Sequence, residues 1–354
     1  MNTRLTSGQK FLLDIYRISA ALLVLIGHSF SYYQISFFKN QDLFPYIQNI
    51  GVIMFFLLSG FLTTYSLNCK NENKDYSFYL FTKHKVIRIM KEYFPGLIFI
   101  GIVDFVSIKI NNSKYLYYNA YNLKQFIGNL FMLHGTAINH ISIIEFVPFG
   151  SGRPLWTLAI EWWFYLLYGF IFLTLANNKV LTIKKGIIGS LLFIMPIDYL
   201  ITGRGSGLGF VFGLGVFAFY IYNLIESNIA RIIFPISCVI YILYGCFYKE
   251  AYTVYSFLIL WVSFCSLMKI GTLCEKNRSV TISFISQSTF MLYLIHYSII
   301  DLIYNCEMIV SVYIKFLLGI IISVLISFIT YYFFGRKNLL LKTYNRFSRI
   351  SKIK

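Results

Sequence analysis

Long apolar runs separated by short polar stretches fill the chain from residue 11 to residue 334. A helix rises ~1.5 Å per residue, so about 20 apolar residues cross the hydrocarbon core of a membrane. Ten runs approach that length, and they predict helices at residues 11–31, 46–67, 92–110, 154–176, 186–202, 206–225, 231–248, 252–270, 285–304 and 311–334. The pattern therefore predicts an all-α fold, a polytopic integral membrane protein with about ten transmembrane helices.

Two segments depart from this simple pattern. The fifth run is short and carries Pro196 and Asp198 near its end, which favours a re-entrant or kinked segment. Residues 121–135 are too few to span, and they predict an interfacial helix or a loop helix. No repeat or long linker divides the chain. We expect one transmembrane domain at residues 1–335, followed by a basic cytoplasmic tail at 336–354 that lies on anionic lipid.

Composition supports the membrane assignment, because 58% of the residues are hydrophobic and only 13% are charged. Soluble domains have about 25% charged residues. The net charge of +17 does not indicate a nucleic-acid partner, because the basic residues lie in short loops and tails between the apolar runs. With ten spans, 22 Lys and Arg residues fall on one side and six on the other. The positive-inside rule then places both termini in the cytoplasm.

The cysteines and the N-terminus add two negative expectations. Six cysteines are scattered without metal-ligand spacing, so no metal site is expected. Basic residues precede the first apolar run, and no small-residue cleavage pattern follows it. We therefore expect the first run to be an uncleaved span.

The first apolar run contains three ionisable residues, Asp14, Arg17 and His28. Such a group costs roughly 2.5–3.5 kcal/mol at bilayer depth on insertion scales, so it tends to be kept for a function. Arg17 and His28 share one stripe of a helix and lie ~16 Å apart along its axis, and Asp14 lies one turn below Arg17. One interpretation is an Asp14–Arg17 pair near the helix start and an interfacial histidine. The other is a polar stripe directed at a buried site, with His28 toward the outer leaflet.

Further polar residues occur in or beside later runs. Gly51, Ser59 and Gly60 in the second run permit close helix contact. The loop that follows carries a basic cluster, Lys83, His84, Lys85, Arg88 and Lys91, beside Glu92 and Pro95. This cluster is either ordinary cytoplasmic charge or a site for a phosphorylated ligand, since guanidinium and ammonium groups match phosphate oxygens.

The fourth, sixth and ninth runs contain the remaining candidates. Glu161 lies among aromatic residues that include Trp156, and a buried carboxylate must meet a cation or take a proton. Arg17 and Arg88 are its candidate partners by type. The sixth run is rich in glycine, which indicates close helix packing or a broken helix that lines a cavity. The ninth run carries Tyr293, His296 and Asp301, and His296 is expected to be a structural or supporting residue.

Four motifs together resemble one family. They are DIYRISAALLVLIGH in the first run, GVIMFFLLSGF in the second, PLWTLAIEWWFYLL in the fourth and STFMLYLIHYSI in the ninth. In this order, the chain resembles the acyltransferase-3 family of integral-membrane acyltransferases, whose bacterial members O-acetylate cell-surface carbohydrates. The resemblance implies a location in the bacterial inner membrane.

The resemblance also assigns roles to residues. Arg17 and His28 match the functional pair of the family, and Glu161 matches the glutamate of its tryptophan-containing motif. Lys85 and Arg88 match a two-arginine motif that meets the acyl-CoA donor, with a lysine in the first place that loses the bidentate fork. Lys83 is expected to assist them. Asp14, Trp156, Tyr293 and His296 are expected to support the site.

The function implied is transfer of an acyl group from cytoplasmic acyl-CoA, with acetyl-CoA the expected donor, to a hydroxyl of a surface polysaccharide. The acceptor expected is a polysaccharide such as O-antigen, capsule or exopolysaccharide, or a lipid-linked glycan. A hydroxyl needs a base to take its proton, and His28 suits that task. Arg17 would orient the donor or stabilise charge at the carbonyl. Direct transfer and an acyl-histidine relay both stay open. The alternative is a transporter or flippase of a lipid-linked glycan, which predicts inverted repeats.

Overall fold

The computed structural model describes residues 4–35, 47–71, 76–135, 145–175, 182–201, 205–248, 250–276, 279–308 and 311–336. These residues are mostly helical, and no β-strand occurs among them, which confirms the all-α fold class. Each of the ten predicted spans coincides with a helix: α1 (Ser7–Tyr33), α2 (Ile47–Asn71), α3 (Phe78–Ile110), α6 (Leu155–Phe170), α7 (Ile183–Ile201), α8 (Leu208–Ile221), α9 (Ser227–Phe247), α10 (Val254–Leu273), α11 (Val280–Asn305) and α12 (Val312–Thr330).

Seven helices of the described chain are long and apolar enough to cross a membrane, namely α1, α2, α3, α9, α10, and α6 and α12 with the π-helical turns that extend them. Helix α8 is apolar but shorter. Helix α11 is 26 residues long, but serine, threonine, glutamine, histidine and aspartate interrupt its apolar sequence. Helix α7 runs without a break through Pro196, so the described residues 183–201 form no re-entrant turn.

Helix α3 begins at Phe78, well before the predicted start at residue 92. The Ser77 hydroxyl caps it by accepting a hydrogen bond from the backbone N–H of Leu80. Phe81, Ile89 and Tyr93 are buried at helical spacing, with Lys85 on the same buried stripe, while Lys83, His84 and Arg88 are exposed. The sequence had placed the basic cluster at residues 83–91 in a loop. The structure places it instead on the first turns of helix α3. The hydropathy pattern does not reveal this part of the helix, because its charged residues lower the local mean hydropathy more than its apolar stripe raises it.

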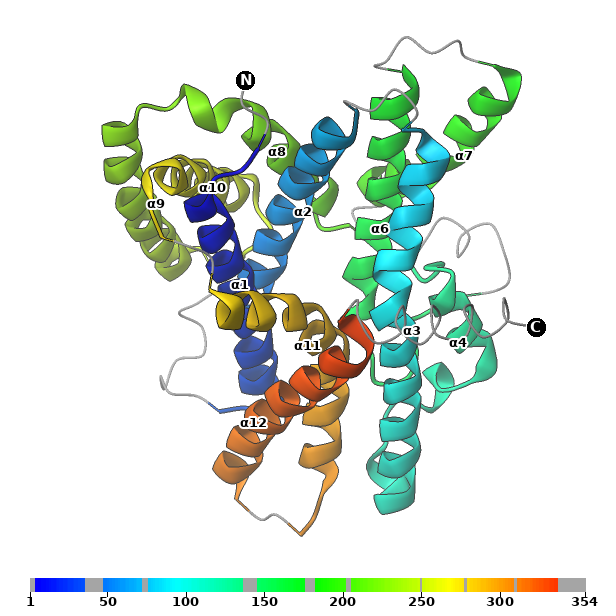
Figure 1. Cartoon of the computed structure of the whole chain (residues 1–354). Helices are drawn as coiled ribbons and strands as arrows, with labels where there is room; N and C mark the ends of the chain where they lie inside the picture. Colours follow the sequence, from blue (N-terminus) through cyan, green and yellow to red (C-terminus); the bar gives the residue numbers. More distant parts are fainter. Residues whose placement is uncertain are drawn as a thin grey trace, which may run out of the picture.

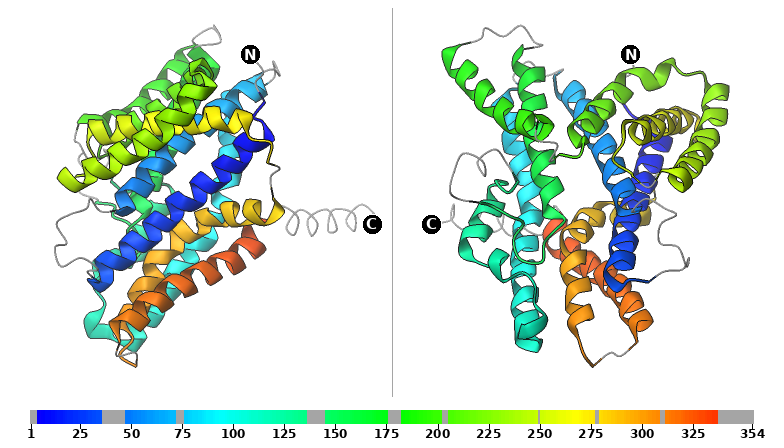
Figure 2. Two further views of the ribbon diagram at one scale, coloured as in Figure 1. Left: turned by 90° about the vertical axis from the view of Figure 1, so that its left-hand side faces the viewer. Right: turned by 180° about the vertical axis from the view of Figure 1, so that it is seen from behind.

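Helices α1 and α11 pack side by side and run in the same direction. The imidazole rings of His28 on α1 and His296 on α11 lie next to each other, and the Tyr33 hydroxyl on α1 donates a hydrogen bond to the Ile300 carbonyl on α11 at 3.1 Å. The start of α12 then packs against the end of α1, where Gly319 faces the Tyr33 ring. Helix α12 therefore returns to the end of the bundle at which α1 begins (Figure 2). The start of α1 and the end of α12 thus lie toward the same end of the bundle, and the cytoplasmic location of this end stays a prediction.

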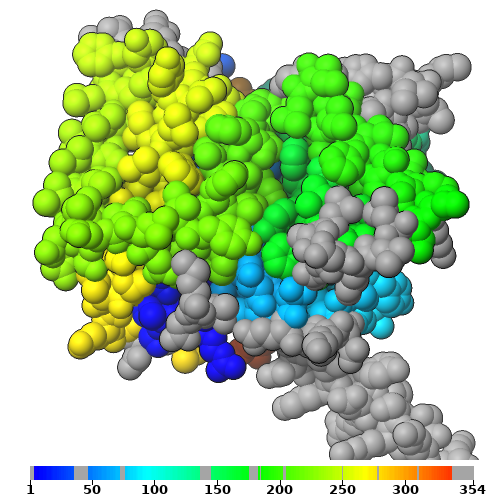
Figure 3. Space-filling view, turned by 90° about the horizontal axis from the view of Figure 1, so that it is seen from above, coloured from blue at the N-terminus to red at the C-terminus, as the bar shows by residue number. Residues whose placement is uncertain are grey.

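The remaining helices flank this centre. In Figure 1, α1, α2, α11 and α12 stand on one side, and α3, α6 and α7 stand on the other. Helix α8 packs on α2, and α9 and α10 pack on each other beside α1. Viewed from the end where α1 begins, α9 and α10 cover one flank and α7 the other, and α2 and α3 appear along the lower edge of the view (Figure 3).

Glycines bring α2 and α8 into close contact. A Cβ at Gly60 would lie 2.1 Å from the Phe212 carbonyl oxygen, and one at Gly215 would lie 2.2 Å from the Leu57 carbonyl oxygen. Gly51 similarly faces the Ala20 backbone on α1. In lipid no hydrophobic force drives helices together, so this close packing is a main source of their association. It confirms the close contact predicted for the second and sixth runs.

Helix α4 (Leu123–Leu130) confirms the short helix predicted within residues 121–135. The Asn122 side chain caps it by accepting from the Gln125 N–H at 2.9 Å. Gln125 and Asn129 then bind the backbone of Glu145 and Val147, which fixes the segment that leads into α6. The same segment is tied to α3, because the Ser151 hydroxyl donates to Asp104 at 2.5 Å.

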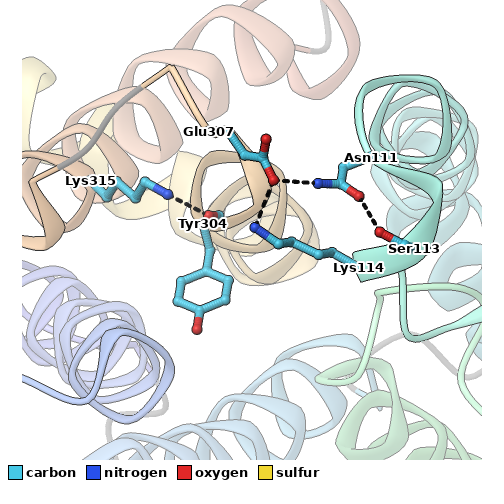
Figure 4. Close-up of polar contacts among 6 residues, drawn as sticks. All are labelled: Asn111, Ser113, Lys114, Tyr304, Glu307 and Lys315. Carbon is cyan, nitrogen blue, oxygen red and sulfur yellow. Dashed lines mark hydrogen bonds and ion pairs between the residues drawn. The ribbon is translucent and has the colours of Figure 1, made fainter.

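The opposite end of the bundle is joined at its surface. Glu307 accepts from Lys114 Nζ and from Asn111 Nδ2, both at 2.9 Å, while Lys315 Nζ donates to the Tyr304 carbonyl at 2.6 Å (Figure 4). The hydrogen bond from Lys114 lowers the pKa of the exposed Glu307 carboxyl. These contacts join the end of α3 to the connection between α11 and α12. The basic tail predicted at 336–354 lies, after Arg336, outside the described residues.

The glycine contact can be tested on one helix. Replacing Gly215 with alanine forces α8 away from α2, and overpacking of this kind costs about 1–3 kcal/mol. We expect Gly215→Ala to lower the apparent melting temperature of the detergent-purified protein and its accumulation in membranes. The matched control is Gly213→Ala on the same helix, because a Cβ at Gly213 has nothing within 4 Å. Equal melting temperatures for the two variants would contradict the close contact.

Candidate active site

A cavity of about 200 Å³ lies between α1, α2, α3, α6 and α11. Apolar side chains such as Val52, Phe55 and Leu158 form part of its wall. The polar side chains that line it are Arg17, Ser59, Thr63, Lys85, Arg88, Lys91, Glu92, Thr157, Glu161, Tyr165, Ser286, Gln287, Thr289, Tyr293 and Tyr331. The structure thus brings together, from four helices, Arg17, Lys85, Arg88, Glu161 and Tyr293, which the sequence had singled out.

Basic groups outnumber acidic ones in the cavity wall. Arg17, Lys85, Arg88 and Lys91 are cationic, whereas Glu92 and Glu161 are the carboxyl groups. Three of these residues, Lys85, Arg88 and Glu92, follow the i, i+3, i+7 spacing that gives one face of α3. Lys91 pairs with Glu92 at 3.3 Å and also donates to the Gly335 carbonyl. The excess of positive charge favours an anionic ligand.

Glu161 is held by two hydroxyl groups. Its Oε1 accepts hydrogen bonds from Ser59 on α2 and from Tyr165 one turn further along α6, and the two hydroxyl oxygens lie 3.0 Å apart. The sequence had offered Arg17 and Arg88 as partners, but the hydrogen bonds described for this carboxyl come from neutral donors. The reason is geometric, because residues four apart share a helix face and Ser59 lies on the facing helix.

Lys85 is buried beside this group. Its Nζ donates to Thr63 Oγ1 at 3.1 Å and lies 3.6 Å from the centre of the Tyr165 ring, which is a cation–π contact. Tyr165 therefore contacts both the ammonium of Lys85 and the carboxyl group of Glu161. Arg88 also lines the cavity, but it is exposed at the surface. The two basic positions of the family motif thus face different depths of the same cavity.

The other predicted residues lie outside the cavity wall. Lys83 is exposed on α3, and Asp14 is buried on α1. Trp156 is half-buried and packs against the apolar core, whereas its neighbour Thr157 lines the cavity and contacts Tyr293. The roles predicted for Lys83, Asp14 and Trp156 therefore do not come from lining the cavity.

His28 occupies a separate position further along α1. Its ring centre lies 5.3 Å from that of His296 and 5.3 Å from that of Tyr297, both on α11. Tyr293 connects this pair to the cavity, because it lines the cavity and its ring centre lies 6.0 Å from that of His296. The polar stripe of α1 thus meets two environments, the cationic cavity at Arg17 and a histidine pair ~16 Å away at His28.

Sequence reasoning missed several residues of the cavity. Ser59 was interpreted as a small packing residue, and Tyr165 as one of a group of aromatics. A usable signal existed for Tyr165, which lies four residues after Glu161 and therefore on the same face of the helix. Gln287 and Tyr331 carried no such signal, since only the packing of α11 and α12 brings them to the cavity, where they form a 3.0 Å hydrogen bond.

The fold and the site together define a polytopic all-α membrane protein with a cationic cavity between its helices and, further along α1, the half-buried His28 against the buried His296. The family described as an acyltransferase domain matches residues 12–332. The chain therefore belongs to this family, the acyltransferase-3 family. A relative described as "O-acetyl transferase", from Shigella phage Sf6, is 27% identical over 170 residues. That match covers 47% of this chain and 47% of the relative, so it spans about half of each. No solved structure matches the chain.

The hydroxyl donors of Glu161 can be tested by removing one of them. A hydrogen bond to a charged group contributes about 1.5–3 kcal/mol, against about 0.5–1.5 kcal/mol for a neutral pair. The Tyr165 hydroxyl is hydrogen-bonded to both the Glu161 carboxyl group and Ser59. Because its removal breaks these contacts at once, we expect Tyr165→Phe to lower the apparent melting temperature in detergent more than Tyr168→Phe does. Tyr168 is a matched control because its hydroxyl pairs with the neutral Thr64 hydroxyl at 3.1 Å on the same pair of helices. A larger loss for Tyr168→Phe would refute the arrangement.

Proposed function

We propose that this protein transfers an acyl group, acetyl first among the candidates, from acyl-CoA to a hydroxyl group of a cell-surface carbohydrate. Family membership supports acyl transfer, and the name of the phage relative supports an acetyl group and an oxygen acceptor. The observation that carries the proposal is the cationic cavity that Arg17 shares with Lys85 and Arg88, with Arg17 on the helix that also sets His28 against His296.

The donor enters the cavity with its acyl end first. Ligand pockets usually have ~300–1,000 Å³, so a cavity of about 200 Å³ holds the acyl group and part of the donor arm but not a whole nucleotide. The exposed Arg88 is then the residue that meets the phosphates, while the buried Lys85 faces the inner part of the arm. This division refines the initial expectation that both residues bind the same phosphates. Glu161, through Tyr165, keeps Lys85 at the wall.

Transfer forms a bond between the acceptor oxygen and the acyl carbon and breaks the carbon–sulfur bond to CoA. In direct transfer, the hydroxyl proton passes to the imidazole of His28, and the imidazolium returns it to the CoA thiolate as that group leaves. In an acyl-histidine relay, the His28 imidazole itself displaces CoA from the acyl carbon and then gives up the acyl group to the acceptor oxygen. Arg17 and His28 lie ~16 Å apart along α1, too far to contact one carbonyl group together. Arg17 therefore orients the donor within the cavity. The extended donor arm brings the acyl group to His28. From there the group passes to the acceptor either directly or through an acyl-histidine intermediate.

The histidine can be tested directly in membranes. His28→Ala removes the base, and general-base catalysis contributes about 10²–10⁴-fold to a rate. We expect at least a 100-fold loss of O-acetylation, measured by mass spectrometry or NMR of the surface polysaccharide, with normal accumulation of the protein. His84→Ala, at an exposed histidine of α3, is the control. Full O-acetylation in the His28 variant would refute the proposal. Release of free CoA in step with acceptor modification separates the enzyme from a glycan transporter.

The donor assignment predicts a selective effect on binding. Arg88→Ala should raise KM for acetyl-CoA about tenfold, the effect of losing roughly 1.4 kcal/mol from a charge-assisted contact. It should leave KM for S-acetylpantetheine, which lacks the phosphates of CoA, within about twofold. Lys109→Ala is the control, because Lys109 is exposed at the far end of the same helix and outside the cavity. An equal change for both donors would show that Arg88 does not read the phosphates.

A further inference from the structure

The buried ring of His296 has one nitrogen bonded and one free. Its Nδ1 lies 3.0 Å from the carbonyl oxygen of Leu292 and 3.0 Å from that of Tyr293, both in the preceding turn of α11. Because both neighbours are acceptors, Nδ1 carries the hydrogen. Nε2 then carries a lone pair. It is buried, and no described residue donates a hydrogen bond to it.

A buried acceptor without a donor destabilises a fold, so it is retained where it has a function. The bonds of Nδ1 account for the orientation of the ring, but they leave Nε2 without a role. His28 on α1 is the histidine beside it. An N–H···N hydrogen bond of ~3 Å between two imidazole edges places the ring centres about 5 Å apart. The observed separation is 5.3 Å, with an angle of 32° between the ring planes.

We propose that His296 is the positioning residue for His28, and that its Nε2 accepts a hydrogen bond from the N–H of His28 when the acceptor carbohydrate binds. No hydrogen bond described in the structure joins the two rings, and a small rotation of His28 forms it. Hydrogen bonds of active sites are often long in the free enzyme and tighten in the complex. This inference rests on the proposed role of His28 as the base.

The bond would fix the tautomer of His28. A base must present a lone pair to the hydroxyl group, so the hydrogen of the neutral ring must lie on its other nitrogen. A partner that accepts that hydrogen selects the active tautomer, as the third member of a nucleophile–base–orienting group does. A neutral histidine suits this place because lipid-embedded helices would have to bury the charge of an aspartate.

Two isosteric replacements separate this role from a structural one. In His296→Asn the amide nitrogen replaces Nδ1 and can still donate to the carbonyl groups of the preceding turn, but nothing replaces Nε2. In His296→Gln the longer amide places an acceptor oxygen near the position of Nε2. We expect the asparagine variant to lose at least about 100-fold in kcat, with KM for acetyl-CoA within twofold of the wild type. We expect the glutamine variant to recover at least tenfold over asparagine.

Wild-type kcat in the asparagine variant, or equal losses in the two variants with normal accumulation, would overturn the inference. The proposed function is tested separately, because it requires activity of the wild type and its loss in His28→Ala. If the wild type transfers no acyl group, the proposed function fails, but the tautomer of His296 can still be measured by NMR. In protein labelled with ¹⁵N-histidine and held in lipid, His296 should show the Nδ1–H tautomer. An Nε2–H tautomer at His296 would leave no lone pair for the N–H of His28 and would also overturn the inference.

Discussion

Polar and ionisable side chains that the helices bury need partners, because lipid cannot solvate them, and in this bundle key partners lie on other helices. This constraint fixes the helices relative to one another. Ser59 on α2 and Glu161 on α6 define one contact, and Lys85 on α3 meets Thr63 on α2. Each hydrogen bond allows one register between its two helices, whereas apolar packing alone tolerates several. The cavity is therefore a consequence of the same contacts that hold α2, α3 and α6 together.

A second set of contacts positions α1 against α10 and α11. Gln9 near the start of α1 donates to the Met268 carbonyl on α10, and Tyr32 near its end donates to Asp301 on α11. Helix α1 is thus held at both ends, which sets His28 against His296 and leaves Arg17 in the cavity wall. Under the proposed function, chemistry at His28 and orientation of the donor at Arg17 are separate tasks. Such a separation suits an enzyme whose donor and acceptor approach from opposite ends of a bundle.

Charge and apolar character have different roles along α3. The later part of α3 is mostly apolar and contacts α11. Its first turns carry basic residues over a narrow buried stripe that includes Phe81 and Ile89. One continuous helix therefore joins the surface to the cavity. Arg88 is exposed and Lys85 is buried one turn earlier, so a single helix face presents positive charge at two depths. A phosphorylated donor with a long arm fits this distribution of charge.

The sequence by itself determined the all-α class, the order of the described helices that follow apolar runs, the presence of glycines suited to close helix contact and the polar stripe of α1. These properties follow from local hydropathy and from the 3.6-residue period, which need no knowledge of neighbours. The start of α3 escaped because its buried stripe is narrow among charges. Only the tertiary structure paired Glu161 with Ser59 and Tyr165 and set His296 beside His28. The physical reason is that a partner from another helix depends on register and packing angle, and neither is encoded in the local pattern.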